Sequence, residues 1–338
     1  MVRFATSFAS FTMATVMAAT LSAQAPPAAP AGEVVGVGNF AHIVQNLDTS
    51  LAFYRDVLGL EVGVSQPFSV NPAIEKLGNT PGGQSRFLAL KVPGTVLGVE
   101  LIEYKDIARQ AQHPRFHDPG AANLALRVRD LDALFPRIEA FPGVKVITAG
   151  GKPVTINTPN GMLHVVFVQD PDGFVVELAS APAQPGAPAG NIVGASFEAT
   201  VANSEQSVKF YNDLLGFNLQ LGASFNPNRQ MAETAGAPGA SFKQSSASIP
   251  GTSVQMTLIE FKDIERKPLK GRVQDPGTAI LQLRVRDVAA LTRKLKAAGV
   301  PVVTTGGEPV EVGNANLKIA LVRDPNNLML ELIQAVQR

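Results

Sequence analysis

The stretch SLAFYRDVLGLEV, residues 50–62, decides the fold, because it returns as SVKFYNDLLGFNL at residues 207–219. Other segments return in the same order. VELIEYKDI (99–107) recurs as MTLIEFKDI (256–264), and DPGAANLALRVRDL (118–131) recurs as DPGTAILQLRVRDV (275–288). An offset that stays at about 155 residues indicates a duplicated domain.

The composition places the chain among globular proteins and excludes several partners. The 338 residues are 45% apolar and 17% charged, and the net charge is +1. The sequence has no basic stripe of the kind that would indicate nucleic-acid binding, and we expect no membrane contact in the mature protein. The expected partner is a small-molecule ligand or substrate, and the expected state is a monomer of two paired domains or a homodimer. Cysteine is absent, which excludes thiolate catalysis and Cys-ligated zinc.

Low-complexity segments divide the chain. We predict a signal peptide at 1–25, a Pro/Ala linker at 26–34, a first domain at 35–180, a Pro/Ala/Gly linker at 181–190 and a second domain at 191–338. Arg3, an uncharged stretch and small residues near position 23 predict export to the periplasm or secretion. An N-terminal membrane anchor is the alternative, although its apolar run is marginal for a bilayer.

Each copy contains two smaller units, each made of a strand, a helix and several further strands. In the first unit Leu51, Tyr54 and Leu58 fall on one helical face, Asp48 can cap the helix, and Gly59 can end it. The runs that follow are rich in β-branched and aromatic residues.

The helix motif, followed much later by DPDGFVVEL (170–178), resembles the vicinal oxygen chelate superfamily, which includes glyoxalase I, extradiol dioxygenases and bleomycin-resistance proteins. The resemblance covers both copies. It implies an α+β fold of two tandem domains, each of paired βαβββ units that form a curved half-open barrel around a cavity.

The resemblance also implies where metal ligands would lie in the first domain. Metal-dependent members use a His or Gln on the first strand, a Glu late in the first unit, a His on the first strand of the second unit and a Glu on the last strand. The corresponding residues here are Asn39, Glu100, Asn123 and Glu177. The matching positions of the second domain carry Ser196, Thr257, Ile280 and Glu331. We therefore expect the second domain to be a scaffold.

His42 is the alternative to Asn39 on the first strand. Strand side chains alternate between faces, so positions 39 and 42 point in opposite directions. Counting back from Asn46 places Asn39 in the cavity and His42 under a helix, and a β-bulge would reverse this.

An oxygen-only set of two Glu and two Asn suits Mg, Mn or Ca better than Zn or Fe. The other interpretation is a polar pocket with no metal. His164 enters the DPDG hairpin. A tight turn would place it on the same face as Glu177, where it could assist catalysis or could simply end a sheet.

Two functions remain open. The first is a metal-assisted lyase, isomerase or dioxygenase that acts on a small oxygenated molecule, with Glu177, Glu100 and His164 as the catalytic candidates. The second is a metal-free module that binds and sequesters a small molecule.

Overall fold

The computed structural model describes residues 33–158, 161–180, 186–312 and 316–336. The predicted signal peptide and the first residues of the central linker lie outside this part of the chain. None of the helices in the described ranges is long and apolar enough to cross a membrane.

Four units follow one another along the chain. The first contains β1 (Val34–Ile43), α1 (Leu47–Leu51) with the π-helical turn η1 (Ala52–Val57), β2 (Glu61–Ser69), α2 (Pro72–Gly78), β3 (Gln84–Lys91) and β4 (Gly98–Lys105). The second contains β5 (Ala122–Val128), α3 (Leu131–Glu139), β6 (Lys145–Val146), β7 (Val154–Thr158), β8 (Gly161–Gln169) and β9 (Val175–Ser180). The third contains β10 (Ile192–Val201), α4 (Ser204–Lys209), η2 (Phe210–Leu214), α5 (Arg229–Thr234), β11 (Ser241–Ser248) and β12 (Gln255–Lys262). The fourth contains β13 (Ala279–Val285), α6 (Val288–Ala297), η3 (Thr305–Gly307), β14 (Val310–Val312), β15 (Leu317–Arg323) and β16 (Met329–Ala335).

An Asn or Asp cap starts the helix after each unit's first strand. The Asn46 side chain accepts a hydrogen bond from the Thr49 backbone N–H at 3.0 Å, so Asn46 caps α1 in place of the expected Asp48. The caps of α3, α4 and α6 are Asp130, Asn203 and Asp287. A cap satisfies N–H groups that have no partner inside the helix. The same local signal therefore ends the strand and starts the helix in all four units.

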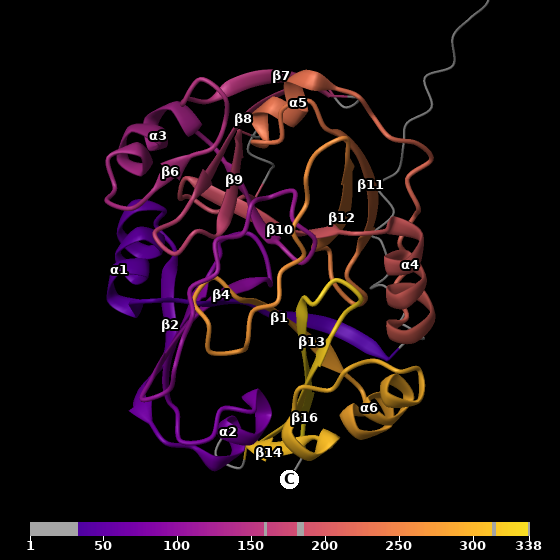
Figure 1. Ribbon diagram of the computed structural model, residues 1–338. Coiled ribbons are helices and arrows are strands. Elements are labelled where there is room, and N and C mark those ends of the chain that lie inside the picture. The colour runs from indigo at the N-terminus through magenta and orange to yellow at the C-terminus, as the bar shows by residue number, and fades with distance from the viewer. Residues whose placement is uncertain (1–32, 159–160, 181–185, 313–315, 337–338) are drawn as a thin grey trace, which may run out of the picture.

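The strands form two eight-stranded sheets, and each sheet takes strands from both copies. Sheet A has the order β14-β15-β16-β13-β1-β4-β3-β2, and sheet B has the order β11-β12-β10-β5-β9-β8-β6, with β7 paired to β8. The first unit therefore shares a sheet with the fourth, and the second shares one with the third (Figure 1). Antiparallel pairs join the copies, with Phe40 opposite Leu281 and Phe197 opposite Leu124.

The main core packs between the sheets and their helices and draws on all four units. The Phe40 and Phe197 rings meet there edge to face with centroids 5.1 Å apart. Side chains alternate along the central strands, so each sheet has a second face opposite the core. This face is concave, and only strands of the same sheet form it. Sheet A and sheet B carry separate apolar clusters on these faces. These two concave faces are the places where a ligand site can form.

Candidate functional site

The concave face of sheet A encloses a cavity of about 560 Å³, within the usual size of small-molecule sites. Side chains of β1, β2, β3, β4, α2, β13, β14, β15 and β16 line it. Most of them are aliphatic. Four polar side chains come from the four central strands: Asn39 on β1, Glu100 on β4, Gln282 on β13 and Glu331 on β16.

Gln282 connects these four residues. Its backbone lies directly opposite that of Glu331 in the β13–β16 pair. Its Nε2 donates to Glu100 Oε2 at 2.6 Å, and its Oε1 accepts from the Asn39 backbone N–H at 3.0 Å. That backbone donor fixes which way the amide points, since the oxygen must face Asn39. The N–H groups of Gln282 therefore face the carboxyl groups.

The two glutamates are buried and interact electrostatically. Glu100 is 9% exposed and Glu331 is 8% exposed. Burial and then the charge of Glu100 raise the pKa of Glu331 to about 8, although a hydrogen bond from Gln282 opposes the rise. Burial also raises the pKa of Glu100, against hydrogen bonds from Gln282 and Asn39 that favour its ionised form. Near neutral pH Glu331 is therefore a carboxylic acid, whereas the amide donors of Gln282 and Asn39 favour the ionised form of Glu100.

Tyr104 lines the same cavity four residues after Glu100 on β4. Burial, then the charges of Glu331 and Glu100, raise the pKa of this phenol above its ordinary value. It therefore keeps its proton at physiological pH and can donate a hydrogen bond to a ligand oxygen.

The arrangement does not fit the divalent metal that the superfamily resemblance implies. The Gln282 oxygen is occupied by a backbone N–H, and amide N–H groups face Glu100 where a cation would need oxygen donors. Across the described ranges, no three His, Cys, Asp or Glu side chains gather closely enough to hold a metal ion. A cation at this site would require the Gln282 amide to turn.

The predicted ligand set is divided between the two sheets, which corrects the sequence-based expectation. Asn39 and Glu100 lie in the cavity of sheet A, whereas Asn123 and Glu177 belong to sheet B. The reason is the exchange of units: β1 pairs with β13 of the second copy and not with β5. Glu331, which we expected to lie in a scaffold, completes the sheet A site.

The structure places Asn39 in the cavity and His42 on the opposite face, in agreement with the residue count. His42 is fully buried, its ring stacks on Phe174 with centroids 3.9 Å apart, and its Nδ1 lies 3.0 Å from the Tyr54 hydroxyl of η1. Burial lowers the pKa of His42 to about 3, so the ring is neutral. Tyr54 in turn donates to Asp170 at 2.9 Å.

His164 lies away from Glu177, contrary to the expected hairpin. Phe167, and not Val166, pairs with Glu177, so His164 is on the other face of the sheet. The turn holds one residue more than the tight form, because Asp170 accepts hydrogen bonds from the backbone of Asp172 and Phe174. His164 instead contacts Asp132 and Thr155. His164 lines neither the cavity of sheet A nor the smaller cavity of sheet B described next.

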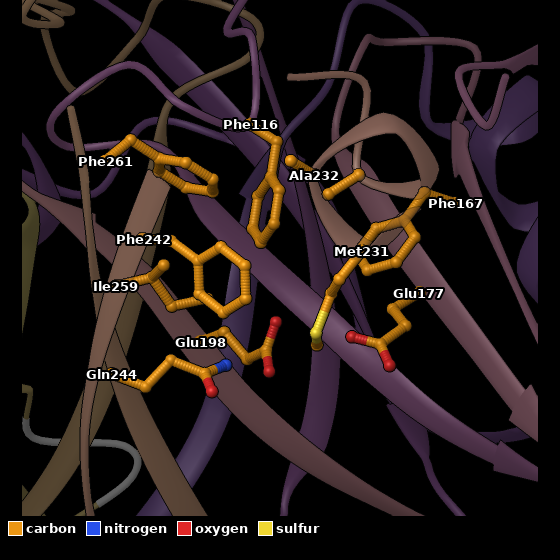
Figure 2. Close-up of a pocket in the computed structure, with 11 residues that line it drawn as sticks. Phe116, Phe167, Glu177, Glu198, Met231, Ala232, Phe242, Gln244, Ile259 and Phe261 are labelled. Carbon is orange, nitrogen blue, oxygen red and sulfur yellow. The ribbon is translucent and has the colours of Figure 1, made fainter. Parts of the chain in front are cut away.

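Sheet B has a cavity of its own, of about 30 Å³. Figure 2 shows the carboxyl groups of Glu177 and Glu198 and the Met231 side chain in one space, beneath the rings of Phe116 and Phe242. Asn123 Nδ2 donates to Glu198 at 2.7 Å. Burial and then the charge of Glu198 raise the pKa of Glu177 well above its ordinary value, and burial also raises the pKa of Glu198, against a hydrogen bond from Asn123. The space holds about two water molecules.

Larger side chains explain why this second cavity is small. Positions that carry Ser85, Val273 and Leu321 around the sheet A cavity carry phenylalanines around the sheet B cavity. Phe242, Phe116 and Phe167 are the corresponding residues, and all three line the small cavity. Sheet A is therefore the sheet with room for a ligand.

Sequence reasoning missed the contributions of Gln282, Glu331 and Tyr104 to one site. A signal was present, because Gln282 stands where the first copy has Ala125, and Glu331 ends the same motif as Glu177. The missing information was which unit pairs with which.

Comparisons with known proteins agree with this architecture. A family model described as the Glyoxalase/Bleomycin resistance protein/Dioxygenase superfamily matches residues 36–178 and 195–332. The 2-epi-5-epi-valiolone epimerase of an Actinomyces species is 33% identical over 157 residues, which are 46% of this chain and 82% of that protein.

Two solved structures share the fold. Glyoxalase I from Zea mays has a TM-score of 0.58 at 18% identity, over 88% of this chain and 92% of that one. A putative dioxygenase from Bacillus subtilis subsp. subtilis str. 168 has a TM-score of 0.56 at 16% identity, over 90% and 86% of the two chains. At these identities the likeness concerns the fold alone.

Proposed function

Since this chain belongs to the Glyoxalase/Bleomycin resistance protein/Dioxygenase superfamily, we propose that it is an isomerase that moves a proton at a carbon next to a carbonyl group. The observation that carries the proposal is the pair Glu100 and Glu331, two buried carboxyl groups of different proton affinity in one cavity. Pairs of titratable groups with separated pKa values supply acid and base roles. The similarity to an epimerase supports the same class of reaction.

Each residue has a defined role in this reaction. The Glu100 carboxylate removes the proton from the carbon, and the electron pair of the broken C–H bond moves onto the carbonyl oxygen. Tyr104 donates a hydrogen bond to that oxygen as its charge grows. The Glu331 carboxylic acid returns a proton to the carbon. Exchange with water then removes the proton from Glu100 and restores the one on Glu331.

Gln282 is a positioning residue. Its amide hydrogen-bonds both glutamates, and the Asn39 backbone holds its oxygen. The pair therefore keeps its geometry before a ligand arrives, which avoids reorganisation during the reaction.

Isotope exchange tests the proposal. In D2O, a panel of enantiopure α-hydroxyketones is incubated with the protein, and 1H NMR follows loss of the α-proton signal while polarimetry follows inversion. We expect exchange with at least one ketone. Glu100→Gln and Glu331→Gln should slow it by about 10²–10⁴-fold, the usual contribution of a positioned acid or base. Wild-type exchange no faster than that of Glu100→Gln across the panel would overturn the proposal.

The reaction should depend on pH in both directions. It requires Glu100 ionised and Glu331 protonated. The rate should fall above about pH 8, where Glu331 loses its proton, and at low pH, where Glu100 gains one.

A binding module is the second candidate function. The observation that favours it is the mainly aliphatic lining, which can retain a small molecule without chemistry. Ligand binding with no proton exchange in the same experiment would select this function.

A further inference from the structure

The walls of the sheet A cavity contain information about its substrate beyond the reaction type. We propose that the cavity takes an uncharged substrate with an apolar body and a single oxygenated end, such as an aryl or aliphatic α-hydroxyketone. This inference rests on the proposed function for the reacting end of the molecule and on the cavity lining for the rest.

Charge is the first argument. Among the described residues that line the cavity there is no Lys, Arg or His. The ionisable groups there are Glu100, Glu331 and Tyr104, all buried. A phosphate or carboxylate on the substrate would lose its water, meet no cation and face the glutamate pair. Anionic substrates are therefore disfavoured.

Three basic side chains on the lining strands are committed elsewhere, and one of them, Arg284 of β13, donates to the Val37 carbonyl oxygen at 3.2 Å. Arg86 of β3 forms an ion pair with Glu103 at 2.7 Å, on the face of the sheet opposite the cavity. Lys318 of β15 lies between the lining residues Leu317 and Ile319 and pairs with Glu311 at 4.0 Å. Strand alternation keeps Arg86 and Lys318 outside the cavity.

The apolar surface is the second argument. The walls continue the apolar cluster of sheet A, and the following side chains belong to both the cluster and the cavity: Ile74, Leu77, Ile102, Ile280, Ile319 and Leu321. They come from α2, β4, β13 and β15. A substrate that buried only hydroxyl groups against these walls would leave its hydrogen bonds unmade.

Polar groups are scarce and already used, which is the third argument. Gln282 and Asn39 bind Glu100, the Asn71 side chain caps α2, and Gln66 donates to Ser69. The groups left to receive a ligand are the two carboxyls, the Tyr104 phenol and the hydroxyls of Ser65 and Ser85, which also line the cavity. The two carboxyls and the Tyr104 phenol match one hydroxyketone end.

Matched probes test the substrate class through both binding and chemistry. The probes are 2-hydroxypropiophenone, its ring 4-carboxylate, and an inosose, a cyclohexanone with five hydroxyl groups. Calorimetry measures binding, and deuterium exchange measures reaction. We expect the uncharged aryl ketone to bind and exchange at least tenfold better than either of the others.

The outcomes separate the two proposals. Equal or better binding of the carboxylate or the inosose would overturn the substrate class, whatever the chemistry shows. Binding of the aryl ketone without exchange would overturn the isomerase function and leave the substrate class standing. Ser85→Lys, which adds a cation to the cavity wall, should reverse the preference between the aryl ketone and its carboxylate. A variant that folds, with a wild-type circular dichroism spectrum, and still rejects the carboxylate would contradict the charge argument.

Discussion

At the residue scale, ionisation of the buried Glu331 carboxyl lowers the stability of the folded protein by a measurable amount. A glutamate ordinarily loses its proton near pH 4.5, but in the folded protein Glu331 keeps it until about pH 8. Between these values the folded state holds one more proton than the unfolded state, so stability falls as pH rises through this window. The cost above pH 8 is on the order of a few kcal/mol.

Glu331→Gln should therefore stabilise the protein while it slows the reaction by about 10²–10⁴-fold. We expect its melting temperature to exceed that of the wild type at pH 9 and the difference to disappear near pH 4. Exposed Glu311→Gln is the control and should change neither property. A Glu331→Gln protein that melts lower than the wild type at pH 9 would show that the Glu331 carboxyl is ionised and paired.

We expect the Gln282 side chain to determine whether the sheet A site can hold a metal. Replacing Gln282 with His puts an imidazole beside the carboxyl groups of Glu100 and Glu331 and removes the amide N–H groups that face Glu100. Three side chains of this kind suit Mn, Ni or Zn. We expect calorimetry to show at least tenfold tighter Mn or Zn binding in Gln282→His than in the wild type, and none in Gln282→Leu. Tight, stoichiometric metal binding by the wild type that persists in Gln282→Leu would contradict our interpretation of the Gln282 amide.

The element scale shows what sequence patterns can establish. Strand alternation was enough to place Asn39 in a cavity and His42 under the helix, because β1 runs from Asn39 to His42 without an inserted residue on the β4 side. The face of His164 could not be derived in the same way. The side chain of Asp170 adds one residue to the turn, and one residue reverses every face beyond it.

Ser85 on β3 and Phe242 on β11 are one of the three pairs of matched positions that set the size of each cavity. Ser85→Phe should fill the sheet A cavity and abolish activity. Phe242→Ser should leave activity intact and lower the free energy of unfolding by about 3 kcal/mol, since it removes a buried ring. Activity assays and denaturant unfolding of both variants give the comparison. Loss of activity in Phe242→Ser at a temperature where it remains folded would mean that sheet B takes part in function.

At the scale of the whole molecule, the sequence predicted the duplication and the fold, whereas the pairing of the units could not be predicted. Both copies carry nearly the same strand motifs, so β1 has compatible partners in β5 and β13, and local pattern cannot choose between them. Contacts within one copy remain: Ser50 donates to Asp172 at 2.6 Å, and Asn326 donates to Ser207 at 3.0 Å. Helix and hairpin thus join units within a copy, and sheets join them across copies.

Because the sheets pair units of different copies, each half of the chain depends on the other. In residues 33–185 alone, β1 and β5 would each lose one of their two partner strands. In the second half alone, β10 and β13 would each lose one as well. Unpaired central edges expose backbone N–H and C=O groups and favour misassembly. We expect either half alone to be inactive. The two halves, expressed together, should recover the proton-exchange activity.

Variants in the separate halves locate the site. A first half with Glu177→Gln should still complement, because Glu177 lies in the small cavity of sheet B. A second half with Glu331→Gln should not, because the sheet A site takes Glu100 from one half and Glu331 from the other. Size-exclusion chromatography confirms that each mixture assembles. Activity in the first half alone, lost on Glu177→Gln, would return the site to residues 35–180 and contradict the assignment to sheet A.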